Sequence, residues 1–176
     1  FPCTQALLGF IGIESEKTRS GVKESLTSTL ELWMNPVIDA ATSRNDFDLR
    51  DLRKRRMSIY LCLQPDQLLI LAPLINLFYQ QVFNLNTNEL PEANPELKYQ
   101  VLFVNDEFPS IGKIGIVAKA NAYIAGFGLR LLTICQSPAQ IRSVYGADDA
   151  ESFFDNHAVE IIFRPKNFKI AKRNNL

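Results

Sequence analysis

The chain has 176 residues, 47% of them hydrophobic, which is enough apolar material for the core of one domain and part of a second. Its 19 basic and 19 acidic residues cancel, so a uniformly basic nucleic-acid-binding surface is excluded and such contacts require a local patch. With one histidine and no closely paired cysteines, a structural zinc site has almost no ligands to draw on. No apolar run reaches the roughly 18 to 20 residues that span a bilayer, so we expect this chain to be soluble.

The N-terminal part is predicted to be helical. Apolar residues recur at intervals of three and four within 20–36, and Pro36 ends the run. Because no strand pattern occurs before it, we expect residues 1–40 to be the end of a separate helical domain and residues 41–176 to be a second domain. The sequence begins with Phe1 rather than methionine, which suggests a piece of a longer protein.

Strand and helix patterns alternate through the rest of the chain. Alternating or continuous apolar runs predict strands at 46–50, 57–63, 100–105, 129–136 and 158–165. Helical periodicity predicts helices at 72–85, at 113–125, from Ser137 onward and across DDAESFFDNH. This alternation is typical of right-handed β-α-β units and a parallel sheet covered on both faces. The expected fold class is therefore α/β, with a mostly parallel sheet flanked by helices.

The predicted strand at 100–105 ends in two adjacent carboxylates, Asp106 and Glu107. Parallel α/β sheets bind their ligands at the carboxyl ends of the strands. An apolar strand followed by Asp-Glu is the Walker B pattern, in which the first carboxylate holds Mg²⁺ through water and the second orients the water that attacks the γ-phosphate of ATP. The alternative is that Asp106 caps the following helix and Glu107 only faces solvent.

Gln136 ends the next predicted strand, 30 residues after Asp106, which is about the length of one β-α-β unit. Its amide is therefore expected at the same edge of the sheet as the carboxylates. There it can hydrogen-bond both the γ-phosphate and the attacking water. The alternative is that Gln136 only starts the QSPAQ turn. Taken together, the two strand ends predict an NTPase site.

A basic run, RDLRKRRM, includes the adjacent residues Arg53, Lys54, Arg55 and Arg56. Clustered lysine and arginine side chains neutralise the phosphates of nucleic acids, so these residues are candidate DNA contacts. The alternative is a solvated turn, which is the more common structure for such a run.

Several blocks in order resemble the TraG-like coupling proteins of type IV secretion and conjugation, which are ATPases related to DNA translocases. The blocks are DFDLRDLRKRRMSIYL, VLFVNDEFPSIGKIGIVAKANAYIAGFGLRLLTICQSPAQIRSVYG and FFDNHAVEIIFRP, and the resemblance covers roughly residues 18–166. It implies that Asp106 and Glu107 are the Walker B pair and that Gln136 is the glutamine of the family's third motif. Some relatives carry an arginine finger near the glycine turn, and Arg130 is the nearest arginine here.

The resemblance also implies a RecA-like domain following an all-alpha domain, with ATP and Mg²⁺ as ligands. The complete protein is expected to be a homo-hexamer on the cytoplasmic face of the bacterial inner membrane. It would deliver relaxase-bound single-stranded DNA, or an effector protein, to the type IV secretion channel proteins. The sequence contains no G-x-x-x-x-G-K-[ST] phosphate loop, so we expect this chain alone to be inactive as an ATPase. The alternatives are a non-catalytic assembly or docking fragment and a DNA-contact module working through residues 50–56.

Overall fold

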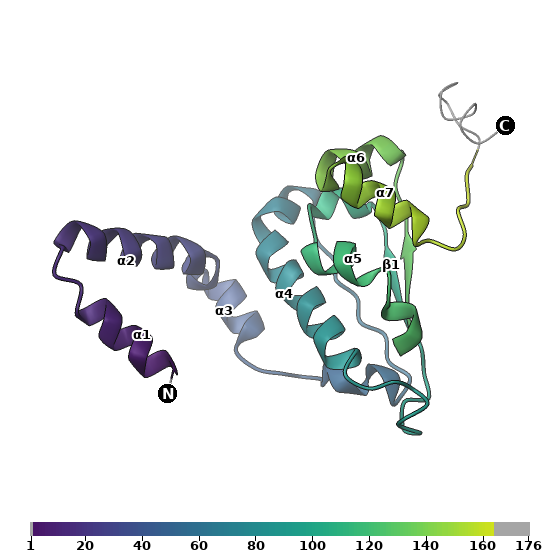
Figure 1. Ribbon diagram of the computed structural model, residues 1–176, viewed down its shortest axis with the longest axis horizontal. Coiled ribbons are helices and arrows are strands. Elements are labelled where there is room, and N and C mark those ends of the chain that lie inside the picture. Colours follow the sequence, from purple (N-terminus) through teal and green to yellow (C-terminus); the bar gives the residue numbers. More distant parts are fainter. Residues whose placement is uncertain (1, 164–176) are drawn as a thin grey trace. The chain divides into compact units, whose positions relative to one another are not determined.

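The structure is a computed structural model that describes residues 2–163, and it divides into two compact units after Asp48 (Figure 1). The first unit contains α1 (Pro2–Ile11), α2 (Glu16–Leu30), a 3₁₀ helix (Glu31–Met34) and α3 (Pro36–Thr42). Ser15 caps α2 by accepting a hydrogen bond from the Thr18 N–H, and Asn35 caps α3 in the same way. The helix expected within 20–36 is present only in part: α2 begins earlier, after the Ser15 cap, and ends at Leu30. Pro36 begins α3 instead of ending the helical run.

The second unit contains the sheet. Its regular elements are α4 (Leu68–Asn86), β1 (Val101–Asn105), α5 (Gly115–Ala120), β2 (Leu129–Thr133), α6 (Pro138–Tyr145) and α7 (Ala147–Asp155). Short 3₁₀ helices lie at Leu49–Arg53, Pro65–Gln67, Phe108–Ile111 and Ile124–Phe127. β1 and β2 are parallel neighbours, with Val101 opposite Leu129 and Asn105 opposite Thr133. The α/β class is confirmed.

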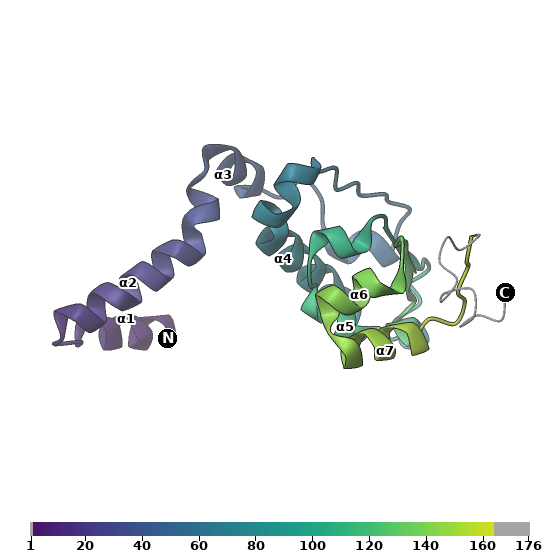
Figure 2. The same cartoon turned by 90° about the horizontal axis from the view of Figure 1, so that it is seen from above.

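The core lies on one face of this two-stranded sheet. Tyr79 and Phe83 of α4 pack against Phe103 of β1, with ring centroids 5.7 and 5.0 Å apart. Buried side chains of α5, α6 and α7 belong to the same cluster, and the three helices pack together (Figure 2). Burial of each large apolar side chain in this cluster contributes about 1.5–3 kcal/mol. The cluster fixes the two strands in register and so determines where their carboxyl ends lie.

The other face of the sheet is exposed. Leu102, Val104 and Leu132 are 58%, 59% and 44% exposed, because alternate residues of a strand point to opposite faces and the buried residues of α4 to α7 all join the cluster on the Phe103 side. The expectation of a sheet covered on both faces is therefore wrong for the described residues.

Some expected elements are absent from the described part of the chain. Residues 46–50 overlap the 3₁₀ helix at Leu49–Arg53, while 57–63 and 158–163 form no strand; residues 164 and 165 lie outside the described residues. A strand exists only where its backbone groups pair with a neighbour. These segments make no such ladder, and Tyr60 and Ile161 are 82% and 73% exposed. The predicted helix at 113–125 is shorter in the structure. α5 ends at Ala120, and a 3₁₀ helix follows at Ile124–Phe127.

One helix of the described residues, Pro65–Asn86, is long and apolar enough to cross a bilayer by length and composition alone. Polar residues such as Gln80 and Gln81 interrupt it, which is why the sequence shows no uninterrupted apolar run there. Ile75 and Phe83 on the same helix are 5% and 1% exposed in the core cluster. Only 22% of its apolar stretch is buried, and Leu69 and Ile70 are 77% and 65% exposed.

Candidate functional site

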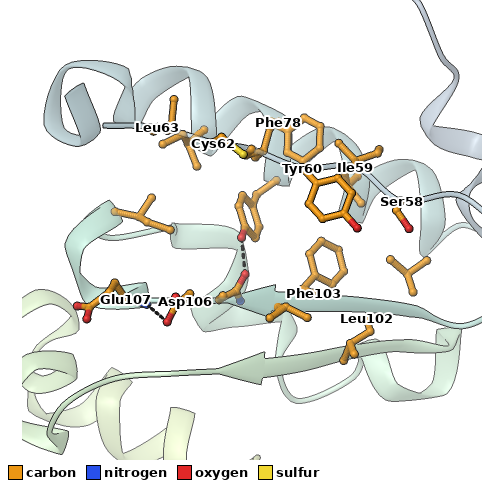
Figure 3. A pocket seen from close by; sticks show the side chains of 18 of the residues that line it. Ser58, Ile59, Tyr60, Cys62, Leu63, Phe78, Leu102, Phe103, Asp106 and Glu107 are labelled. Atoms are coloured by element: carbon orange, nitrogen blue, oxygen red, sulfur yellow. Dashed lines mark hydrogen bonds between the residues drawn. The ribbon is translucent and has the colours of Figure 1, made fainter. Parts of the chain in front are cut away.

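The site expected at the strand ends begins where β1 and β2 leave the sheet. Backbone pairing continues past both strands, since the Ile134 N–H donates to the Asn105 carbonyl at 2.9 Å and the Phe108 N–H donates to the Ile134 carbonyl at 3.1 Å. These bonds hold the turn that contains Asp106 and Glu107 beside the end of β2 (Figure 3). The two carboxylates therefore stand at the carboxyl edge of the sheet.

Glu107 has a left-handed backbone conformation, with φ 49° and ψ 37°. It is the one non-glycine residue with positive φ among the described residues, and this conformation costs about 1–2 kcal/mol for such a side chain. Asp106 Oδ1 accepts the Glu107 N–H at 3.1 Å, which stabilises the turn. Strain of this size is commonly concentrated at functional sites.

Gln136 reaches the same turn from the end of β2. Its Nε2 donates to Glu107, with 3.1 Å to Oε1 and 3.4 Å to Oε2. The structure therefore brings together the two side chains for which the sequence predicts one site. The 3₁₀ helix that follows Glu107 has no side-chain cap, so Asp106 does not serve as its cap and bonds only the next residue's N–H in the turn.

A buried polar pair anchors the end of β1. The Tyr79 hydroxyl donates to Asn105 Oδ1 at 2.5 Å, and the two residues are 6% and 3% exposed. Burial raises the pKa of Tyr79 to about 12, so the phenol stays protonated and remains a donor. Neither Tyr79 nor Asn105 was predicted from the sequence to support the site. The available signal was an amide at the inward-facing strand position two residues after Phe103.

A groove of about 960 Å³ runs along β1 and has Asp106 and Glu107 in its wall. Its other walls are residues 57–63 and the side of α4. Figure 3 shows Tyr60 and Phe103 on opposite sides of this space. The carboxylates therefore border an accessible space, and residues 2–163 leave them uncovered.

Asp106 is exposed and offers the hard oxygen donors that Mg²⁺ prefers. Mg²⁺ retains several waters and takes only one or two carboxylates, with the remaining ligands coming from nucleotide phosphates. A single exposed carboxylate at a strand end fits that requirement. The chain provides no phosphate loop, so its residues fit one part of a Mg²⁺–nucleotide site.

Arg130 is not brought to the carboxylates. It lies near the start of β2, whereas Gln136 follows the end of that strand. Its Nη1 donates to the carbonyls of Ala125 at 2.6 Å and of Leu129 at 3.0 Å. Within one chain, Arg130 therefore sits at the opposite end of the strand from the predicted site.

The basic run is divided by the fold. Arg53 is 2% exposed, and its Nη1 donates to the carbonyls of Asn86 and Glu89, at 2.8 and 2.9 Å, where α4 ends. Burial lowers the pKa of the Arg53 guanidinium, and the charges of Glu89 and Glu92 oppose that shift. An arginine in this position satisfies carbonyls at a helix end and is not available to a DNA phosphate.

The other basic side chains are accessible. Lys54 Nζ lies 3.0 Å from Glu96 Oε2, and Arg55 Nη2 lies 2.9 Å from Asp51 Oδ2. Arg56 is exposed. Ion pairs at this degree of exposure contribute little to stability, so these pairs do not prevent contact with a partner.

Comparison with known proteins shows the family to which the chain belongs. The family model described as "Type IV secretory system Conjugative DNA transfer" matches residues 5–173. Protein VirD4 of Rhizobium rhizogenes is 38% identical over 132 residues, which is 75% of this chain and 19% of the relative. Conjugal transfer protein TraG of Escherichia coli is 30% identical over 168 residues, covering 89% of this chain and 26% of the relative.

The type IV secretion system-coupling protein VirD4 of Bartonella quintana is 24% identical over 97% of this chain and 26% of its own length. The chain thus spans about a fifth to a quarter of the curated relatives that it matches. Because the family model covers nearly the whole chain, the resemblance noted in the sequence is confirmed. The chain belongs to the conjugative DNA transfer family of type IV secretory systems, and it is a portion of a coupling protein.

Proposed function

We propose that this chain carries one half of the ATP-hydrolysing site of a type IV secretion coupling protein, within a RecA-like domain. The observation that supports this most strongly is the contact between Glu107 and Gln136 at the carboxyl edge of two parallel strands. A carboxylate held by a neutral amide beside a second, exposed carboxylate is suited to positioning a metal ion and an attacking water for phosphoryl transfer. The phosphate loop would come from a part of the protein outside this chain.

In this site Asp106 would hold Mg²⁺ through water, and Glu107 would accept a hydrogen bond from the attacking water and orient it. Mg²⁺–ATP, when bound, would supply the electrophilic phosphoryl group. Gln136 holds the Glu107 carboxylate through one N–H of Nε2, and its second N–H remains for a phosphate oxygen. The left-handed turn at Glu107 keeps the carboxylate in place before the nucleotide binds.

The remaining roles belong to the whole protein, of which this chain is a portion. We propose a homo-hexamer at the cytoplasmic face of the inner membrane that passes relaxase-bound single-stranded DNA, or an effector protein, to the secretion channel. The role in transfer is supported by the relatives, which are a conjugal transfer protein and a type IV secretion system-coupling protein. Arg130 is proposed as an arginine finger only toward the site of a neighbouring subunit, because it lies at the far end of β2 from its own carboxylates.

Replacing Asp106 tests the proposed function. Asp106→Ala in the full-length protein is expected to weaken ATP binding about tenfold or more in Mg²⁺, because the metal loses its protein carboxylate. In EDTA the variant and the wild type should bind alike. Titration with a fluorescent ATP analogue under both conditions measures the difference. Asp155→Ala, an exposed aspartate at the end of α7, is the matched control. Equal Mg²⁺-dependent affinity in both variants would favour the non-catalytic docking alternative.

The DNA-contact alternative rests on the accessible part of the basic run. We expect that changing Lys54, Arg55 and Arg56 to Ser, with Arg53 retained, leaves single-stranded DNA affinity of the full-length protein unchanged. The chain has no net charge, so nothing else in it indicates a DNA-facing surface, and exposed charges away from a partner contribute little. The measurement is the slope of log affinity against log salt. A slope flattened by about 2, at roughly 0.7 for each lost phosphate contact, would contradict this expectation.

A further inference from the structure

Gln140 lies in the first turn of α6 and bonds the backbone that carries Gln136. Its Oε1 accepts the Gln136 N–H at 3.0 Å and the Ser137 N–H at 3.2 Å. The Ser137–Gln140 pair forms a capping box at the start of α6, and Gln140 itself is half-buried. One side-chain oxygen therefore satisfies the N–H groups on both sides of the Gln136 α-carbon.

These two hydrogen bonds to one acceptor limit the rotation of the Gln136 backbone. The Gln136 side chain is exposed, and a free glutamine side chain loses about 1.5–2 kcal/mol of rotamer entropy when it is fixed. A fixed backbone restricts the positions that the Gln136 amide can occupy. If the backbone were free to rotate, the 3.1 Å contact between Gln136 Nε2 and Glu107 Oε1 would be only one of several side-chain conformations.

The helix that presents Gln140 is itself held against the segment after Glu107. At the other end of α6 the Tyr145 hydroxyl accepts the Ile114 N–H at 3.1 Å, and the Tyr145 ring stacks on Phe108 with centroids 5.7 Å apart. Both ends of α6 are thus attached to the loops that follow β1 and β2. Gln140 projects from a rigid element, which is what precise placement of another side chain requires.

We propose that Gln140 is a positioning residue for hydrolysis, which holds Gln136 in the orientation that engages Glu107 and the nucleotide. This inference rests on the proposed ATPase function of the site. Gln140 acts through the backbone of Gln136 and does not itself contact the nucleotide. Its loss should therefore lower turnover and leave nucleotide affinity nearly unchanged.

The test compares kcat and KM for ATP in the full-length protein. Gln140→Met keeps the length of the side chain and removes the acceptor, and it is expected to lower kcat about tenfold with KM for ATP within about twofold. Gln140→Glu keeps an acceptor oxygen and should restore kcat to within about threefold of the wild type. In a Gln136→Ala background, Gln140→Met should cause no further loss, because the two residues act as a unit.

Tyr145→Phe is the matched control for helix stability. It removes a hydroxyl acceptor for a backbone N–H at the opposite end of α6 from Gln140, and it keeps the ring that stacks on Phe108. Both Gln140→Met and Tyr145→Phe should lower the thermal midpoint by a few degrees, about 2–4 °C in a large domain, and only Gln140→Met should lower kcat.

The outcomes separate this inference from the proposed function. If Gln136→Ala loses turnover while Gln140→Met keeps a normal kcat, the inference on Gln140 is overturned and the proposed function stands. An additive loss in the double variant, or an equal loss of kcat in Tyr145→Phe, would also overturn it. If the full-length protein lacks ATPase activity, or Gln136→Ala turns over normally, the proposed role of the site fails first and the inference fails with it.

Discussion

Glu107→Gln in the full-length protein is expected to bind ATP normally and to lose turnover by about 10²-fold or more. The amide has the size of the carboxylate but cannot accept the proton of the attacking water. The turn at 107 should survive, because its left-handed backbone is held by the Asp106 side chain and by the Phe108–Ile134 bond. The change therefore separates chemistry from binding.

Measurement of steady-state hydrolysis together with equilibrium ATP binding checks this prediction. Glu151→Gln, the same change at an exposed position on α7, serves as the control and should leave both quantities unchanged. Hydrolysis within a few fold of the wild type in Glu107→Gln would remove Glu107 from the proposed mechanism. The phenotype should differ from that of Asp106→Ala, which affects Mg²⁺-dependent binding.

The pairing of Glu107 with Gln136 could be anticipated from the sequence because it depends on topology rather than on local detail. Two apolar runs separated by one helix-length segment become adjacent parallel strands, and parallel strands end at the same edge. Register then follows from the alternation of inward residues such as Phe103 and Leu131. The sequence could not reveal the left-handed backbone at Glu107, since glutamate carries no preference for that conformation.

The expected strand at 57–63 shows where sequence reasoning fails. An apolar run indicates that a segment will be buried, but the partner that pairs with it is set by the whole fold. In the described residues this segment lines the groove beside β1 and pairs with no strand. Apolarity and β-propensity were therefore insufficient to predict a ladder.

The prediction that Arg53 is a candidate DNA contact fails for a different reason. Its neighbours Lys54, Arg55 and Arg56 share its charge, so the sequence gives no basis for separating them. The fold separates them because the end of α4, 33 residues later in the chain, presents the Asn86 carbonyl to Arg53. A long-range contact of this kind leaves no local pattern in the sequence.

The largest expected loss of stability comes from Phe108→Ala. Phe108 is fully buried and stacks on Tyr145 and Phe153, each with ring centroids 5.7 Å apart. Truncation removes the buried ring and leaves a cavity that rigid neighbours fill only partly, so the free energy of unfolding should fall by about 3–5 kcal/mol. Urea unfolding of this 176-residue chain, followed by far-ultraviolet circular dichroism, measures the change.

Phe163→Ala is the matched control, because the same ring is removed from a position that is 88% exposed. It should change the free energy of unfolding by less than about 0.5 kcal/mol. A loss below about 1 kcal/mol in Phe108→Ala would mean that this ring is not part of a packed core. The packing matters to the site because Phe108 directly follows Glu107 and its N–H bonds the Ile134 carbonyl beside β2. The ring that anchors this segment in the core is thus also what holds the strained turn at the edge of the sheet, where Gln136 meets it.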